Sequence, residues 1–382
     1  MAARGHRLER VFTTMFDFDF DALRRIGWND RLADALATAF TCCDAAAAAS
    51  LRLLRLTEVH RDRLVADDGH ASFGVRALPA FERTLRFEDA VLAVGDWVLA
   101  RKDAHRNAWI EARLAPRRAI TRRDADGRRH AIVSHVDTAL FVMGLDADFN
   151  PRRIERYLLL APPGVQPVVV LTKADLVAPD PQVREAMVAD ERDALLARLG
   201  GGLPVVSVDA TSPSAALVLA PWLEPGHTLV LLGSSGAGKS TLTNALLARR
   251  EQDTGAVRVR DLRGQHTTTA RSLHRLPGGA CVIDTPGLRA LRPDVDADTL
   301  ARSFDDIDRL APRCRFRDCT HDREPGCAVR DGVDADRLRN FHKLRRELGR
   351  DTMTALDRRR RAEWAFSGRQ GAERARAKRG ER

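Results

Sequence analysis

The sequence has no long uncharged apolar run and little cysteine. No stretch approaches the roughly 18 apolar residues that a membrane helix needs, and the first residues lack the basic, apolar and small-residue pattern of a secretory signal. We therefore expect a cytoplasmic protein with no membrane partner. The six cysteines are too few and too clustered for a disulfide scaffold, because three of them fall between Cys314 and Cys327. This clustering indicates a metal site instead.

The 382 residues are enough for two or three domains of ordinary size. Apolar residues make up 44% of the chain and charged residues 30%, a composition that can fill hydrophobic cores. Within the net charge of +10, the last 25 positions hold ten basic residues and three acids. Such a tail would attract a polyanion such as nucleic acid by counterion release, although a solvated helix face is the alternative interpretation.

Hydrophobic patterning divides the chain into five segments. Residues 1–50 are Ala-rich with apolar residues at helical spacing, which predicts an N-terminal helical extension. Short apolar runs broken by Asp, Gly and Pro predict a small β-barrel over 51–122. Continuous Val, Leu and Ile runs alternate with helical segments over 132–292, which predicts an α/β domain with a mainly parallel sheet. Residues 293–350 are helical in pattern apart from the cysteine cluster, and 351–382 form a basic C-terminal tail.

The strongest local motif is GSSGAGKS, residues Gly233–Ser240. It fits the pattern G-x-x-x-x-G-K-[ST] between a strand-like run, HTLVLL, and a helix-like run, STLTNALLARR. The glycines let backbone N–H groups close around phosphates at a helix N-terminus. Lys239 would reach the β and γ phosphates, and the hydroxyl of Ser240 would bind Mg²⁺.

Two further motifs end buried strands. In CVIDTPG, Asp284 would hold Mg²⁺ through water and the Gly287 amide would meet the γ-phosphate. In LTKADL, the carboxylate of Asp175 would accept hydrogen bonds from N1–H and the 2-amino group of guanine, while the stem of Lys173 covers the base. The base-reading motif precedes the phosphate loop, which reverses the order of an ordinary small GTPase. A circularly permuted GTPase domain is therefore predicted.

The cysteine cluster follows the spacing C-x4-C-x-H-x5-C at Cys314, Cys319, His321 and Cys327. Three thiolates and one imidazole make a complete tetrahedral ligand set for zinc. Four protein ligands leave no open position for a reactive water. The pattern therefore predicts one structural zinc ion.

These motifs in this order, with RGQHTTT between the phosphate loop and DTPG and with VGDWV in the barrel region, resemble the ribosome small subunit-dependent GTPase A family. The match covers roughly residues 85–347. The resemblance implies an OB-fold barrel, a permuted GTPase domain and a helical zinc-binding domain. It also implies a monomer that docks on the small ribosomal subunit and its rRNA late in assembly, and that hydrolyses GTP to GDP when the subunit stimulates it.

The resemblance assigns roles to the matching positions. Those expected at guanine are Thr172, Lys173, Asp175 and the backbone of Ala210; those at the phosphates are Ser235, Gly236, Ala237, Gly238, Lys239, Ser240 and Thr241; those in the switch are Thr267, Thr268 and Thr269. The pair Asp209-Ala210 departs from the Ser-Ala of many relatives. Leu288 follows DTPG where small GTPases commonly have a water-orienting Gln, and its side chain cannot hydrogen-bond. His266, directly before the switch threonines, is the candidate for positioning the catalytic water.

Two other functions remain open from the sequence. One is a phosphate-loop ATPase or kinase in which TKAD is accidental. The other is an RNA-binding module whose nucleotide site only stabilises the fold. Turnover of GTP against ATP separates the first from a GTPase, and hydrolysis in the presence of small ribosomal subunits separates the second.

Overall fold

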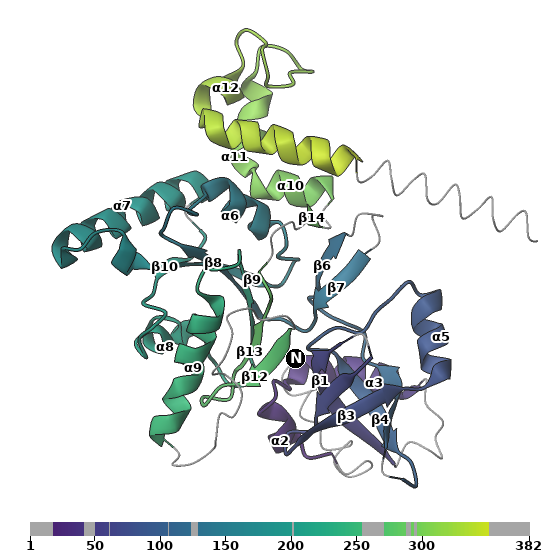
Figure 1. Cartoon of the computed structure of the whole chain (residues 1–382). Helices are drawn as coiled ribbons and strands as arrows, with labels where there is room; N and C mark the ends of the chain where they lie inside the picture. The colour runs from purple at the N-terminus through teal and green to yellow at the C-terminus, as the bar shows by residue number, and fades with distance from the viewer. Residues whose placement is uncertain are drawn as a thin grey trace, which may run out of the picture. The chain divides into compact units, whose positions relative to one another are not determined.

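The computed structural model describes residues 18–41, 50–60, 62–105, 107–123, 129–200, 202–253, 271–287, 292–293 and 296–350. The chain divides into two compact units (Figure 1). The first contains the barrel and α/β regions, within 1–122 and 130–293, and the second contains the cysteine-rich region, within 123–129 and 294–382. None of the helices in the described ranges has the length and apolarity that a membrane span requires.

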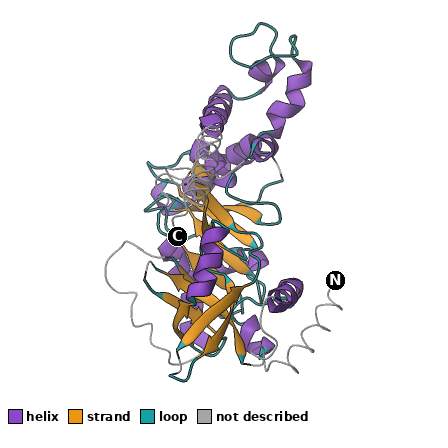
Figure 2. Cartoon of the chain, turned by 90° about the vertical axis from the view of Figure 1, so that its right-hand side faces the viewer, coloured by secondary structure: helices purple, strands orange, loops and turns teal. Residues whose placement is uncertain are grey.

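The barrel is made by five strands among the described residues: β1 (Leu51–Val59), β2 (Leu64–Asp67), β3 (Ser72–Ala77), β4 (Trp97–Lys102) and β5 (Ala108–Arg113). β1 pairs antiparallel with both β2 and β4, and β3 pairs parallel with β5, so the sheet closes on itself (Figure 2, orange strands). Closure satisfies the backbone groups that an open edge would expose. The arrangement confirms the expected OB-fold barrel.

Helix α5 (Pro79–Phe87) connects β3 to the segment before β4, and the pattern of short apolar runs does not predict it. Phe81 and Leu85 lie one helical turn apart and are buried, while Phe87 is 93% exposed. The helix is amphipathic, but seven of its nine residues are exposed, so it contributes none of the short apolar runs from which the strands are predicted.

The described part of the N-terminal extension packs on the barrel. It comprises α2 (Phe20–Arg24), η1 (Asp30–Leu32) and α3 (Ala33–Thr41). Its apolar side chains share one core with the barrel residues Leu51, Leu53, Trp97, Leu99 and Leu114. Trp28 and Trp97 meet edge to face, with their ring centroids 5.3 Å apart. Residues 1–17 and 42–49 lie outside the described part of the chain.

The α/β region has a parallel sheet in the order β10-β9-β8-β11-β13, with β12 antiparallel at its end. The strands are β8 (Thr138–Gly144), β9 (Gln166–Thr172), β10 (Val205–Ser207), β11 (Thr228–Leu232), β12 (Ser272–Arg275) and β13 (Cys281–Asp284). A separate small sheet joins β14 (Arg292–Pro293), β6 (Ile120–Arg123) and β7 (Arg129–Val133). Because β8, β9 and β10 precede the phosphate-loop strand β11, the circularly permuted order is confirmed.

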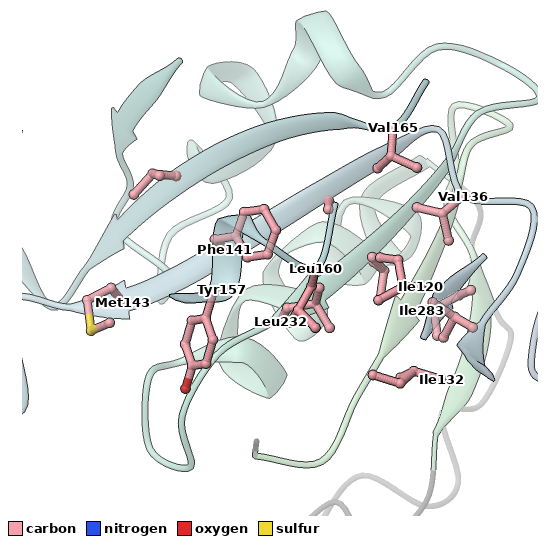
Figure 3. Close-up of a cluster of buried hydrophobic side chains, with 14 of the residues drawn as sticks. Ile120, Ile132, Val136, Phe141, Met143, Tyr157, Leu160, Val165, Leu232 and Ile283 are labelled. Atoms are coloured by element: carbon pink, nitrogen blue, oxygen red, sulfur yellow. The ribbon is translucent and has the colours of Figure 1, made fainter. Parts of the chain in front are cut away.

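Both faces of the parallel sheet are covered by helices. Alternate residues of β8 enter different cores: Phe141 and Met143 pack with residues of α6 (Pro151–Leu158) and α7 (Pro181–Leu199), as Figure 3 shows for Phe141, Met143 and Tyr157. Leu140 and Val142 pack with residues of α8 (Ala215–Val218), η3 (Ala220–Trp222) and α9 (Lys239–Asp253). This two-sided burial explains the continuous apolar runs in the sequence.

The barrel is joined to the α/β sheet at β12. Glu58 of β1 pairs with Ser272 of β12. Arg275, at the other end of β12, forms an ion pair with the buried carboxylate of Asp67 and donates a 2.8 Å hydrogen bond to the carbonyl of Gly69. The barrel therefore contacts the strand that directly precedes the DTPG strand β13.

Arg55 of β1 is fully buried and connects the three parts of this unit, namely the N-terminal extension, the barrel and the α/β region. Its guanidinium donates to the carbonyls of Ile26 at 2.5 Å, Gly95 at 3.3 Å and His135 at 3.4 Å. It also lies over the ring of Trp97, 5.3 Å from the centroid. Burial lowers the pKa of Arg55, and nearby carboxylates oppose this. A buried cation with several carbonyl partners favours one arrangement of the segments that supply them.

We expect Arg275→Ala to lower the free energy of unfolding of this unit by about 1–3 kcal/mol, because the buried carboxylate of Asp67 would lose its cationic partner. The exposed pair of Arg86 and Glu82, 3.1 Å apart, provides the control. Arg86→Ala should change stability by less than about 0.5 kcal/mol. Urea denaturation followed by tryptophan fluorescence measures both. Equal effects of the two variants would contradict the role given to Arg275.

The second unit is helical, as the sequence pattern predicts. It contains α10 (Ala297–Ser303), α11 (Asp305–Leu310), η4 (Ala311–Arg313), α12 (Ala328–Gly332) and a helix over 335–350. Arg337 is 3% exposed and binds both carboxylate oxygens of Asp306, at 2.9 and 2.8 Å. The same guanidinium stacks over Phe304, 4.4 Å from the ring centroid. These contacts connect the helix over 335–350 to α11.

Candidate nucleotide-binding site and metal centre

The phosphate loop runs from the end of β11 to the first residues of α9. Its strand is buried throughout, and the loop begins at Gly233 and passes into the helix at Lys239. Gly238 has φ +88, and a Cβ there would lie 3.2 Å from the hydroxyl of Thr172. Glycine is therefore required at this position for two reasons: the backbone is left-handed, and the hydroxyl of Thr172 leaves little room for a Cβ. The expected phosphate contacts at 235–241 thus surround the N-terminus of a 15-residue helix.

Lys239 reaches back across its own loop. Its ammonium donates to the carbonyls of Gly233 at 3.1 Å and Ser234 at 2.8 Å, and the residue is 6% exposed. Burial lowers the pKa of Lys239, and the neighbouring carboxylate of Asp284 acts in the opposite direction. The ammonium is thus held by the carbonyls of its own loop, and a bound anion there would compensate its burial.

Ser240 and Asp284 come together beside the phosphate loop. The hydroxyl of Ser240 donates to Oδ2 of Asp284 at 3.0 Å. Thr285 follows Asp284 and donates to the carbonyl of Leu231 at 2.6 Å, which holds the end of β13 against β11. A hydroxyl and a carboxylate are hard oxygen donors of the kind that Mg²⁺ prefers. The residues therefore fit the magnesium site that the sequence predicts.

The DTPG turn touches the phosphate loop directly. A Cβ on Gly287 would lie 2.5 Å from both the backbone nitrogen and the Cα of Ser235. Only glycine allows the two backbones to approach this closely. The DTPG turn and the phosphate loop are therefore in contact, and the bond from the Gly287 amide to the γ-phosphate stays a prediction.

The base-reading motif is tied to the phosphate loop. Thr172, at the end of β9, is fully buried and donates its hydroxyl to the carbonyl of Ala237 at 2.8 Å. The structure thus gives the Thr172 side chain a partner in the loop itself. Two motifs that are distant in sequence meet at the carboxyl edge of one sheet, which is where ligands bind in open α/β folds.

Lys173 and Asp175 follow directly. Lys173 has a left-handed backbone, with φ 59 and ψ 33, and its ammonium lies 2.5 Å from Oδ2 of Asp146. Asp175 lies in the short helix η2 (Ala174–Leu176) and is exposed. The sequence motifs do not single out Asp146. Its position two residues beyond the buried strand β8, at the ligand-binding edge, is the signal that could have found it.

Ala210 lies in a turn, three residues after the end of β10. The residue is 7% exposed, and its side chain packs in the core that also contains residues of α8 and α9. Asp209 turns the chain there, accepting hydrogen bonds from Thr211 N at 2.9 Å and Thr211 Oγ1 at 2.6 Å. These bonds, from the hydroxyl first, lower the pKa of Asp209. The guanine contact from the Ala210 backbone stays a prediction, as do the other nucleotide contacts.

His266 and the switch residues Thr267, Thr268 and Thr269 lie outside the described residues, and so does Leu288.

The four residues of the cysteine cluster converge in the second unit. One ligand atom from each of Cys314, Cys319, His321 and Cys327 lies within 4.8 Å of the others. Nδ1 of His321 is 3.6 Å from Sγ of Cys314 and 3.5 Å from Sγ of Cys327, and those two sulfurs are 3.9 Å apart. Ligands bonded tetrahedrally to zinc at about 2.0–2.3 Å are separated by about 3.3–3.8 Å. The cluster therefore could bind one zinc ion.

The backbone around the cluster is arranged to hold it. His321 has φ 65, a conformation that costs a non-glycine residue about 1 kcal/mol or more and that often marks functional positions. Its carbonyl oxygen lies 3.2 Å from Nε2 of His342 on the helix over 335–350. The carboxylate of Glu324 accepts bonds from Thr320 and from the backbone nitrogens of 322 and 323, and these bonds lower the pKa of Glu324 to about 2.

Cys281 lies apart from this cluster, within β13. It is fully buried, and burial raises the pKa of its thiol to about 11. A thiol with this pKa is neither a ready nucleophile nor a metal ligand near neutral pH.

Comparisons with known proteins agree with this arrangement. The RsgA GTPase family model matches residues 114–293. The small ribosomal subunit biogenesis GTPase RsgA of Xanthomonas axonopodis pv. citri is 45% identical over 341 residues, which cover 86% of this chain and 89% of that protein. The protein of the same name from Xylella fastidiosa strain M23 is 48% identical over 307 residues, with 78% and 88% covered.

Two solved structures share the fold. YjeQ from Thermotoga maritima has a TM-score of 0.54 at 23% identity, with 78% of this chain and 98% of that chain covered. YloQ, described as a circularly permuted GTPase, has a TM-score of 0.51 at 21% identity, with 78% and 95% covered. Identity of 45% across most of both chains, together with the family match over the permuted domain, shows that this chain belongs to the RsgA family of GTPases.

Proposed function

We propose that this GTPase binds the small ribosomal subunit and its rRNA late in subunit assembly, and hydrolyses GTP to GDP and phosphate when the subunit stimulates it. The observation that carries the nucleotide part of the proposal is the 2.8 Å bond from Thr172 to Ala237, which joins the TKAD motif to the phosphate loop. The subunit part is supported by the relative from Xanthomonas axonopodis pv. citri, which aligns over 86% of this chain and is named for small-subunit biogenesis. A net charge of +10 favours an RNA partner. A monomer in the cytoplasm is part of the proposal.

The residues at the sheet edge have different roles in nucleotide binding. Asp175 selects guanine, and the backbone of Ala210 closes the base site. Lys239 and the amides of 235–241 bind the phosphates, and Gly287 contributes its amide at the γ-phosphate. Ser240 and Asp284 would hold Mg²⁺, which when bound neutralises charge on the β and γ phosphates. The zinc proposed at the cysteine cluster has no open position and stabilises the second unit.

Hydrolysis with and without purified small ribosomal subunits tests this function. The parent should show low turnover alone and much faster GTP turnover with subunits, while ATP is a poor substrate. Lys239→Ala is the matched inactive control, because it removes a phosphate contact and no core packing. Dominant ATP turnover would identify a phosphate-loop ATPase or kinase instead. No hydrolysis with subunits present would favour an RNA-binding module.

His266→Ala should keep GTP and subunit binding and lose most of the subunit-stimulated turnover. The reason is that Leu288 cannot orient a water, whereas a neutral imidazole beside Thr267 can accept a hydrogen bond from it. If contact with the subunit positions the imidazole against the water, one local step explains both the low basal rate and the stimulation. Single-turnover hydrolysis with saturating subunits measures the effect. A variant that is stimulated as strongly as the parent would remove His266 from the mechanism.

A further inference from the structure

We propose that Asp146 is a positioning residue of the guanine site, which holds Lys173 so that the lysine stem covers the base. The inference rests on the proposed function, because it takes residues 172–175 to be the guanine reader. Asp146 lies in the loop after β8, outside the motifs that the sequence connects with nucleotide.

The contact is an ion pair at the mouth of the site. Nζ of Lys173 lies 2.5 Å from Oδ2 of Asp146, and the two side chains are 32% and 22% exposed. The other carboxylate oxygen accepts from the backbone nitrogen of Asp148 at 3.0 Å, so the loop itself orients the carboxylate. Burial raises the pKa of Asp146, but the hydrogen bonds from Lys173 and Asp148 lower it by more. The net effect is a lowered pKa, so the group is ionised at neutral pH.

The backbone of Lys173 is held in an unusual conformation. Its left-handed φ of 59 costs a residue with a Cβ about 1–3 kcal/mol, and such residues are retained where the surroundings impose them. The segment that follows β8 supplies the constraint, because Leu145 N donates to the carbonyl of Thr172 at 2.8 Å. The loop that carries Asp146 is thus hydrogen-bonded to the strand end that carries Lys173.

The path of the lysine stem is defined by Gly144. A Cβ at that position would lie 3.0 Å from Cδ of Lys173 and 3.2 Å from Oδ2 of Asp146. The stem therefore crosses the carboxyl end of β8, and its ammonium ends at Asp146. β8 lies between β9, which leads to the base reader, and β11, which leads to the phosphate loop.

A lysine stem held at this place provides an apolar surface for the face of a base. A free lysine side chain would lose up to about 2 kcal/mol of rotamer entropy on being ordered by the ligand. The ion pair with Asp146 orders the side chain beforehand, which improves affinity without a direct contact between Asp146 and the nucleotide. Asp175 reads the guanine edge, whereas Asp146 acts on the base through Lys173.

A double-mutant cycle tests the proposal. Parent, Asp146→Asn, Lys173→Met and the double variant are compared by competition of GDP, IDP, ADP and tripolyphosphate against a fluorescent GDP. Asp146→Asn should weaken GDP and IDP by the same factor, about 3- to 10-fold, and leave tripolyphosphate unchanged. Lys173→Met keeps a long apolar stem without the charge, and in that background Asp146→Asn should have no further effect. Asp148→Asn, an exposed carboxylate of the same loop, is the control and should bind like the parent.

Two results would overturn the proposal. A further loss of GDP affinity in the Lys173→Met background would mean that Asp146 contacts the nucleotide itself. An equal loss of tripolyphosphate affinity would mean that Asp146 supports the phosphate loop and has no role at the base. A parent that binds ADP more tightly than GDP would refute the proposed guanine site instead, so the two failures are distinguishable.

Discussion

Asp175→Asn should change the nucleotide preference of this protein from guanine to xanthine. The Asp175 carboxylate can accept from both N1–H and the 2-amino group of guanine, and these bonds are charge-assisted. An amide nitrogen in place of one oxygen opposes the 2-amino group and matches the 2-oxo group of xanthine. GDP affinity should fall about 100-fold or more, as expected when a site built to accept hydrogen bonds faces unpaired donors.

Competition of GDP and XDP against a fluorescent guanine nucleotide measures the exchange of preference. Asp190→Asn on α7 makes the same change of charge at an exposed position and should bind like the parent. Unchanged GDP affinity in Asp175→Asn, with no gain for XDP, would refute the assignment. The exposed position of Asp175 in η2 makes a folding defect an improbable cause of any loss.

Loss of zinc should unfold much of the second unit while the first unit still binds nucleotide. Residues 314–327 join η4 to α12, and His321 and Cys327 are their buried members. Zinc binding to such sites releases about 10–16 kcal/mol, which becomes folding energy when the site is not preformed. Cys319→Ser should therefore lose the metal, lower the helical circular dichroism signal and weaken subunit binding.

Cys281→Ala is the control, because it also removes a thiol but from the core of β13. Protein purified without chelator should contain one zinc per chain in the parent and in Cys281→Ala, and none in Cys319→Ser. GDP affinity should be preserved in Cys319→Ser, since the nucleotide site and its two cores belong to the first unit. A Cys319→Ser protein that keeps its zinc and its helical signal would contradict the prediction.

Local chemistry explains why much of the site could be predicted. The phosphate loop, DTPG and the zinc cluster each need particular residue types within a short segment. The reason is that the groups that form a turn, or that bind a metal at such a cluster, come from residues close together in the sequence. The order of TKAD before GSSGAGKS likewise predicts the permutation, because an ordinary small GTPase has these two motifs in the opposite order along the chain. The continuous apolar runs predict strands covered on both faces, as β8 and β11 are.

Periodicity identifies which face of an element is buried, but it does not identify the partner. The parallel pairing of β3 with β5, the contact of β1 with β12 and the ion pair of Arg275 with Asp67 therefore come only from the tertiary structure. The same holds for α5, whose two buried side chains, Phe81 and Leu85, find their partners in the barrel core.

The amino-acid sequence by itself determined which local motifs this protein carries: a phosphate-loop pattern at Gly233–Ser240, the TKAD motif for which we predict guanine binding, and a set of four zinc-type ligands. Only the tertiary structure decided how these groups are held. Thr172 bonds to Ala237 and Lys173 to Asp146 because parallel strands distant in the chain end at the same sheet edge. Such contacts depend on which strands become neighbours in the sheet. The order of the strands is determined by the joint burial of many side chains, which no local motif specifies.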